Sequence, residues 1–450
     1  MAAPASLRVT NARLHPTPEH GLKTYDLLVE GDRITSLAEA GSRPARVPAE
    51  VREIDAQGRF LSPPLVDPHV HLDIALTVGQ PRHNATGTLI EAIQIWSELK
   101  PSLTVDEVKA RALEVIRWEV AQGTGFIRSH VDVCDPNLTA VRALSELRRE
   151  VKDLVDLQLI AFPQDGVLSF PQGKELMREA MRLGCEVVGG IPHYEWTRED
   201  GIEEVQFIFD LAQELGAPVD LHCDETDDEQ SRFLEHVAAH TMRRGMQGRV
   251  VAGHTTAMAS YNDNYAFKLI QILRRAGVTI VANPLDNIVL QGRFDTYPKR
   301  RGVTRVKELD AAGINVACGH DSVMDPCYPL GRGSMLDALS MLVHVAQMTG
   351  RDELFRAYEM VSCNPARGAG RPASIEEGAC ASFVIFDCED EVDAIRLRPP
   401  ALAVVREGRV VARTEPARTR IFRQDREEPV TFTPAHSERP HHQHQGGNPN

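Results

Sequence analysis

The sequence lacks the features expected of a membrane protein, of a secreted protein and of a nucleic-acid-binding protein. Its eight cysteines are scattered without CxxC pairs, which predicts reduced thiols in a cytoplasmic protein. No apolar run approaches the length of a bilayer-spanning helix, and the N-terminus does not resemble a signal peptide. With 50 basic against 64 acidic residues, the net charge is −14, so there is no electrostatic footprint for nucleic acid.

Short alternating strands are predicted at both ends of the chain. Apolar and polar residues alternate between residues 6 and 60, and the pattern returns from about residue 376. We expect residues 1–65 and 373–427 to form one composite β-sandwich. Residues 428–450 are polar and rich in Gly and Pro, and they predict a disordered tail.

The segment 66–372 has a different hydrophobic pattern, in which eight predicted apolar strands are separated by stretches long enough for a helix. One such stretch, Thr104 to Gln122, has apolar residues at helical spacing after a Thr start. Strands that alternate with helices pair in parallel, and eight such units predict a (β/α)8 barrel of the TIM type. At 450 residues the chain is long enough for this barrel plus the smaller domain.

Polar residues with catalytic potential stand at the carboxyl ends of these strands, where barrel enzymes place their active sites. The ends carry His69 and His71 (first strand), Gln164 (third), His222 and Glu225 (fifth), His254 (sixth), and Asp321 and Ser322 (eighth). Residues i and i+2 of a strand face the same side, so the first pair can aim at one point. Three histidines and the eighth-strand aspartate suit one zinc or iron(II) ion, with a position left for water.

Several of these stretches together resemble a known family. They are His69-Val-His-Leu-Asp, Phe162-Pro-Gln-Asp-Gly, His222-Cys-Asp-Glu-Thr, His254-Thr-Thr-Ala-Met, residues 291–302 and Gly319-His-Asp. From about residue 60 to 350 the chain resembles the amidohydrolase superfamily and, within it, the bacterial cytosine deaminases. The resemblance implies a barrel beside a β-sandwich and one catalytic iron(II) or zinc ion. Matched by position, the metal ligands are His69, His71, His222 and Asp321.

The resemblance also implies roles for three further residues, and elementary chemistry agrees with them. Glu225 becomes the proton shuttle, His254 the residue that orients water, and Gln164 the partner of a substrate amide. A bound metal supplies hydroxide at neutral pH, while Asp321 can accept the water proton and pass it to ammonia. From the residues alone, Glu225 could equally be a solvated loop acid, and Gln164 could serve a structural turn.

Two positions depart from the cytosine deaminase pattern. Ser322 stands where that family has a second aspartate, and Cys327 stands where it has a tryptophan. Both changes predict a roomier and less polar pocket. We therefore expect 5-methylcytosine to be accepted at least as well as cytosine, with ammonia released. The alternative is a cytosine deaminase with compensating changes.

Other functions were weighed against this one. Dihydroorotase-like cyclic-amide hydrolases carry a modified lysine at the end of the fourth strand, and residues 187–195 contain none. Deaminases of isoguanine or creatinine stay open as alternatives. A non-catalytic scaffold should have lost at least one metal ligand or the acid, and none of them is missing. The unrelated zinc deaminases that carry a P-C-x-x-C motif are excluded because this chain has no such motif.

Some residues near the expected site are surplus to a one-metal set. They are His130, His193 and His320. The basic stretch 294–307 favours a solvated loop or a subunit contact over an anion site. The expected partners are a small nucleobase and further copies of the chain in a homo-oligomer, with neither nucleic acid nor membrane.

Overall fold

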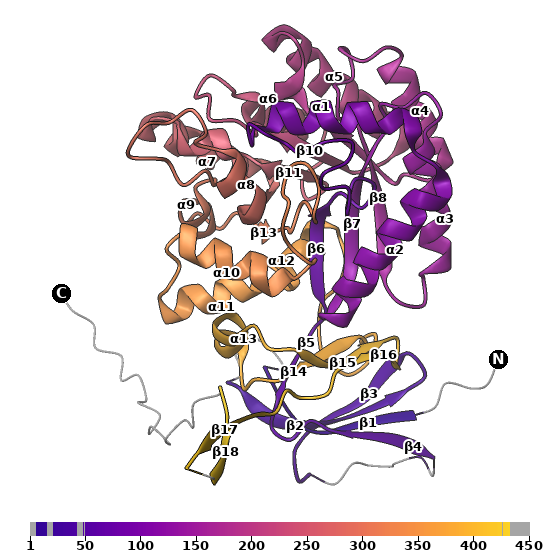
Figure 1. The fold of residues 1–450 in the computed structure, drawn as a ribbon, viewed down its shortest axis with the longest axis vertical. Helices are drawn as coiled ribbons and strands as arrows, with labels where there is room; N and C mark the ends of the chain where they lie inside the picture. Colours follow the sequence, from indigo (N-terminus) through magenta and orange to yellow (C-terminus); the bar gives the residue numbers. More distant parts are fainter. Residues whose placement is uncertain (1–5, 16–20, 43–47, 49, 425, 433–450) are drawn as a thin grey trace.

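A barrel of eight parallel strands forms the centre of the larger domain of this computed structural model, which describes residues 6–15, 21–42, 48, 50–424 and 426–432 (Figure 1). The strands are β6 (Leu65–Val70), β7 (Thr124–Asp132), β8 (Asp156–Phe162), β9 (Val187–Gly190), β10 (Val219–Cys223), β11 (Val250–His254), β12 (Thr279–Ala282) and β13 (Val316–Cys318). Each pairs in parallel with its neighbours in chain order. The expected (β/α)8 barrel is confirmed.

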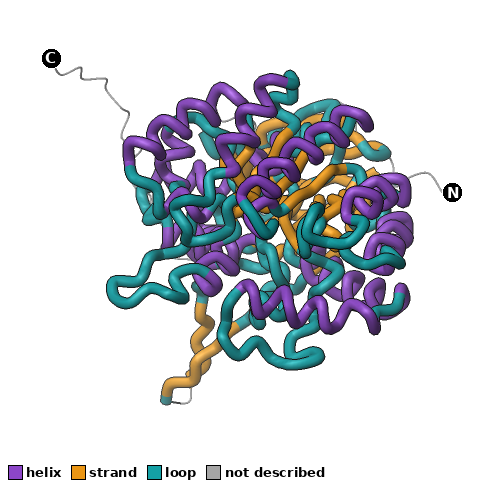
Figure 2. Tube along the Cα trace, turned by 90° about the horizontal axis from the view of Figure 1, so that it is seen from above, coloured by secondary structure: helices purple, strands orange, loops and turns teal. Residues whose placement is uncertain are grey.

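Helices surround the strands, as the view along the barrel shows (Figure 2). They are α1 (Leu89–Leu99), α2 (Val105–Ala121), α3 (Thr139–Glu150), α4 (Gly173–Leu183), α5 (Arg198–Leu215), α6 (Phe233–Arg243), α7 (Asp263–Ala276), α8 (Pro284–Leu290), α9 (Val306–Ala311), α10 (Met335–Val345), α11 (Arg351–Glu359) and α12 (Cys363–Gly368). A further helix, α13 (Glu391–Leu397), lies between β14 and β15 of the second domain and packs against α10 and α11. Short 3₁₀ turns are η1 (Lys100–Ser102), η2 (Pro192–Tyr194) and η3 (Thr256–Ala259).

Helix α2 shows how local sequence starts these elements. The Thr104 hydroxyl accepts a hydrogen bond from the backbone N–H of Glu107, which satisfies one of the free donors of the first turn. Val108, Ala112 and Val115 recur at helical spacing and are fully buried. The helix expected over 104–122 is therefore present, with its apolar face toward the strands.

The second domain is one sheet made from both ends of the chain, as expected. Its strands are β1 (Ser6–Leu14), β2 (Lys23–Glu30), β3 (Arg33–Glu39), β4 (Val51–Asp55), β5 (Phe60–Ser62), β14 (Phe383–Phe386), β15 (Ala401–Arg406) and β16 (Arg409–Arg413). The antiparallel pairing of β5 with β14 joins the two ends. A bridge between Arg33 and Cys380 brings β3 back toward β14, so the sheet curls around its own apolar core.

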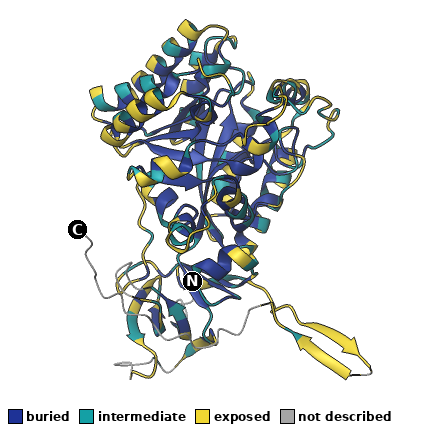
Figure 3. Cartoon of the chain, turned by 90° about the vertical axis from the view of Figure 1, so that its left-hand side faces the viewer, coloured by how far each residue is buried: buried dark blue, intermediate teal, exposed yellow. Residues whose placement is uncertain are grey.

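A two-stranded hairpin of β17 (Thr419–Arg423) and β18 (Arg426–Val430) projects from the body of the protein (Figure 3). It forms a sheet of its own and does not join the composite sheet. The sequence predicts disorder from residue 428, whereas β18 continues to Val430, and 433–450 lie outside the described residues. Within the described ranges, no helix is both long enough and apolar enough to cross a bilayer.

Candidate active site

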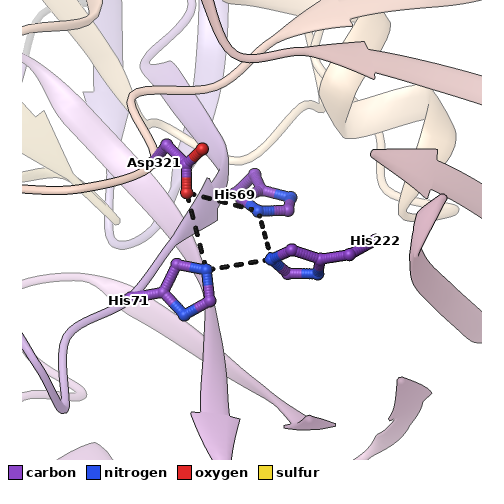
Figure 4. A group of neighbouring side chains, drawn as sticks. All are labelled: His69, His71, His222 and Asp321. Atoms are coloured by element: carbon purple, nitrogen blue, oxygen red, sulfur yellow. Dashed lines mark hydrogen bonds and ion pairs between the residues drawn. The ribbon is translucent and has the colours of Figure 1, made fainter. Parts of the chain in front are cut away.

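Four side chains from three strand ends converge at the carboxyl end of the barrel (Figure 4). His69 lies on β6, and His71 is the first residue after the end of that strand. His222 lies on β10, and Asp321 follows β13. The Nε2 atoms of His69 and His71 lie 3.1 and 3.0 Å from Nε2 of His222. Oδ1 of Asp321 lies 3.5 Å from Nε2 of both His69 and His71. These are the four residues expected to hold the metal.

The donor set fits a divalent cation. Ligand atoms about 2.0–2.1 Å from one ion at tetrahedral angles lie about 3.3 Å apart, close to the separations observed. Burial, followed by the charge of neighbouring imidazoles, holds the pKa of His69, His71 and His222 well below its usual value. Neutral imidazoles are the form that binds metal. Burial and nearby carboxylates raise the pKa of Asp321 well above its usual value, so the ionised carboxylate requires a cation beside it.

The same residues close the barrel. The backbone N–H of Asp321 donates to the His69 carbonyl at 2.7 Å, and the N–H of His71 donates to the Asp321 carbonyl at 3.1 Å. The buried Asp67 carboxylate accepts the N–H groups of His69 and His320 at 3.1 and 3.2 Å. We call these contacts the barrel seam. Asp321 is held there at φ +73°, a costly conformation for a residue with a side chain.

Glu225 and His254 stand beside the second oxygen of Asp321. Nδ1 of His254 lies 3.2 Å from Oε1 of Glu225 and 3.7 Å from Oδ2 of Asp321. It also lies 3.0 Å from the amide nitrogen of Asn287, and Nε2 lies 3.2 Å from that of Asn283. Burial raises the pKa of Glu225 to about 8. A carboxyl group in this environment can give and take a proton near neutral pH.

Gln164 follows β8, and a buried ion pair between Asp132 and Lys100 holds its backbone. The Asp132 carboxylate accepts the backbone N–H of Gln164 at 3.3 Å, the Trp96 indole N–H at 2.8 Å and the Lys100 ammonium at 2.9 Å. Lys100 also pairs with Asp165. The Gln164 side chain is half-buried and makes no hydrogen bond to another described residue, so its amide is available to a ligand.

His130, set aside as surplus, packs against the ligand cluster with its ring 4.0 Å from that of His69. His69, His130 and Asp220 form a second group whose donor atoms lie close together. Arg128 already pairs with Asp220 at 2.8 Å, so this carboxylate is neutralised without an ion. The group is therefore part of the ionic packing inside the barrel.

Two further acids are buried in the loops at the carboxyl end of the barrel. Asp286 on α8 and Asp325 are buried carboxyl groups, and burial raises the pKa of each above its usual value. The roomier and less polar pocket expected from Ser322 and Cys327 stays a prediction. Sequence reasoning missed Asn283 and Asn287, which contact His254, although the strand-end rule applied to the seventh strand, β12, points to residues 283–287.

Two cavities lie at opposite ends of the barrel. One of about 290 Å³ is lined by Asp325, Cys327 and residues of the loop between β6 and α1. A larger one of about 610 Å³ lies between the amino ends of the strands and the composite sheet, where it is lined by Arg371 and Arg406. Neither lining includes a residue of the ligand cluster.

A parallel barrel with a buried His and Asp cluster at its carboxyl end defines a metal-dependent hydrolase. The profile of the amidohydrolase family matches residues 52–412, and the chain belongs to that family. It is a metal-dependent hydrolase that acts on C–N bonds, of the deaminase kind.

Similar proteins include three with a stated activity. The crystal structure of 5-methylcytosine deaminase from Klebsiella pneumoniae with 5-fluorocytosine is 44% identical, with a TM-score of 0.88, covering 92% of this chain and 99% of that one. Pterin deaminase of Rhizobium rhizogenes is 30% identical over 88% of this chain and 90% of its own. N-isopropylammelide isopropyl amidohydrolase of Pseudomonas sp. is 28% identical, and the match covers 87% of this chain and 94% of that protein.

Proposed function

We propose that the protein is a hydrolytic deaminase of free aminopyrimidine bases, which converts 5-methylcytosine to thymine at least as well as cytosine to uracil. The convergence of His69, His71, His222 and Asp321 beside Glu225 carries the proposal. The donor types suit one zinc or iron(II) ion. The fourth barrel strand, β9, ends without a lysine, which favours one metal over the two of cyclic-amide hydrolases.

A metal ion held by these four residues would supply hydroxide at neutral pH, because a bound cation lowers the pKa of water. Glu225 donates a proton to the ring nitrogen next to the carbon under attack and regains one from the hydroxyl group added to that carbon. Oδ2 of Asp321 faces His254, away from the other ligands, and accepts the proton of the water before passing it to the departing ammonia. His254, held by Asn283 and Asn287, orients the attacking water.

The side chains at the pocket wall support a substituted pyrimidine. The Gln164 amide offers both a donor and an acceptor, which matches the N–H and C=O edge of a pyrimidinone. Ser322 and Cys327 are small, and Cys327 borders the cavity of about 290 Å³. These small side chains support a pocket that accepts a methyl group on the ring carbon beside the reacting centre. The 44% identical 5-methylcytosine deaminase structure supports the same assignment.

Ammonia release from a panel of bases tests the proposal. The protein loaded separately with zinc and iron(II) is assayed with 5-methylcytosine, cytosine, isoguanine, creatinine and dihydroorotate. We expect kcat/KM for 5-methylcytosine to equal or exceed that for cytosine, with no ring opening of dihydroorotate. A higher kcat/KM for isoguanine or creatinine, or ammonia from none of the bases, contradicts the proposal.

A further inference from the structure

Helix α1 and the turn that follows it contribute buried polar groups that the mechanism above does not use. Trp96 is 2% exposed and Lys100 is 8% exposed, although each side chain carries a strong hydrogen-bond donor. The Trp96 indole nitrogen and the Lys100 ammonium lie 2.8 and 2.9 Å from the same atom, Oδ2 of Asp132. Apolar side chains of similar volume are often at least as stable as a buried ion pair, so stability alone does not explain these groups.

The two oxygens of Asp132 face different parts of the protein. While Oδ2 takes the donors of Trp96 and Lys100, Oδ1 accepts the backbone N–H groups of Cys134 and Gln164 at 2.8 and 3.3 Å. The carboxylate is planar, so donors that fix Oδ2 also fix the direction of Oδ1. Asp132 therefore connects the end of α1 to the turn that carries Gln164.

The segment around Gln164 is also held on both sides along the chain. Two residues before it, the Phe162 ring stacks on the ring of His222 with centroids 4.0 Å apart, which places the segment beside the ligand cluster. Beyond it, the Glu195 carboxylate accepts the three backbone N–H groups of residues 167–169 at 2.7, 2.7 and 2.9 Å. The backbone is thus fixed, whereas the half-buried Gln164 side chain makes no hydrogen bond to another described residue.

We propose that Trp96 and Lys100 are positioning residues for substrate recognition: acting through Asp132, they place the Gln164 amide where it binds the N–H and C=O edge of the pyrimidine. The inference rests on the proposed function and extends it from Gln164 to the side chains that hold it. Such support matters because a misplacement of about 1 Å in a binding group can cost about 100-fold in rate.

The proposal predicts which kinetic parameter changes. The N–H and C=O edge of cytosine lies across the ring from the carbon that bears the amino group. Gln164 therefore binds the same atoms before and during the attack on that carbon. Loss of an interaction made equally in the ground state and the transition state raises KM and leaves kcat nearly unchanged.

A double-mutant cycle tests the link between Trp96 and Gln164, with the better substrate of 5-methylcytosine and cytosine. Trp96→Phe removes the N–H group that reaches Asp132, and Gln164→Ala removes the amide. We expect Gln164→Ala to raise KM roughly 10- to 100-fold, the equivalent of two neutral hydrogen bonds, and Trp96→Phe to raise it about three- to tenfold. In the double variant Trp96→Phe should add less than about twofold, because positioning acts only through the amide.

Two further variants accompany the cycle. Lys100→Met should raise KM about tenfold, and less than about twofold in the Gln164→Ala background; Trp96→Phe still decides if Lys100→Met does not fold. Ser97→Ala is the matched control on α1, because the Ser97 hydroxyl donates to Asp165 at 3.0 Å. Its KM should stay within about twofold of wild type. Metal content should stay at one equivalent throughout.

The outcomes separate this inference from the proposed function. A wild-type protein that releases ammonia from none of the bases overturns the proposed function, and this inference with it. In an active enzyme, an unchanged KM in Trp96→Phe, independent losses in the cycle, or an equal effect of Ser97→Ala overturns the positioning role. An increase in KM that disappears in the Gln164→Ala background, with Ser97→Ala unchanged, supports it.

Discussion

Replacement of Glu225 by glutamine tests the proposed proton shuttle. The side chain is 5% exposed and its Oε1 lies 3.2 Å from His254, so the nearly isosteric amide can occupy the same space. It cannot transfer a proton, and general acid–base catalysis is worth roughly 10²–10⁴-fold. We expect kcat for ammonia release to fall by that factor. Because Glu225 is outside the group of four ligands, elemental analysis should still find one equivalent of metal.

The neighbouring acid Asp224 provides a matched control. Its buried carboxylate accepts the N–H groups of Phe233 and Leu234 at 3.0 and 2.9 Å, at the start of α6, and the Ser231 hydroxyl at 2.7 Å. Asp224→Asn should therefore reduce the free energy of unfolding by about 1.5–3 kcal/mol, with a much smaller effect on kcat. A Glu225→Gln variant within about tenfold of wild type would remove Glu225 from the mechanism.

Three further predictions concern the metal, the substituent and the support of the pocket. His71→Ala should leave well under one equivalent of tightly bound metal and abolish ammonia release; full metal content by elemental analysis would place the ion elsewhere. Cys327→Trp should lower the kcat/KM ratio of 5-methylcytosine to cytosine roughly tenfold, since a methyl group changes discrimination by about 1–3 kcal/mol; an unchanged ratio would refute the role of this wall. Lys100→Met leaves the carboxylates of Asp132 and Asp165 buried without their cation, so denaturant titration should show a loss of about 3–5 kcal/mol; an unchanged midpoint would contradict this account of the network.

The barrel and the ligand set could be predicted because their signals are local. Alternating strands and helices fix parallel pairing, and the carboxyl ends of parallel strands meet at one end of a barrel. His69, His71, His222 and Asp321 each follow from that rule. The structure brings these four within one group, as expected.

The remaining features depend on contacts between distant segments. Asn283 and Asn287 become informative only when they lie against His254, and nothing in the sequence near these residues signals that contact. The support of Gln164 by Lys100 likewise joins a turn after α1 to the end of β8. The strands of the hairpin β17–β18 are exposed and pair only with each other, and composition does not distinguish them from strands of the main sheet.

The barrel seam couples ion binding to the opening of the fold. An ion that binds only the closed seam raises the free energy of opening by about 2.7 kcal/mol at a concentration 100 times its dissociation constant. The backbone amides of His71 and Asp321 form the hydrogen bonds between the first and last strands. Where opening of the seam limits their exchange, these amide hydrogens should exchange with solvent about 100-fold more slowly in the metal-loaded protein. Occupancy of the centre can thus be followed at two backbone positions by hydrogen exchange, without any substrate present.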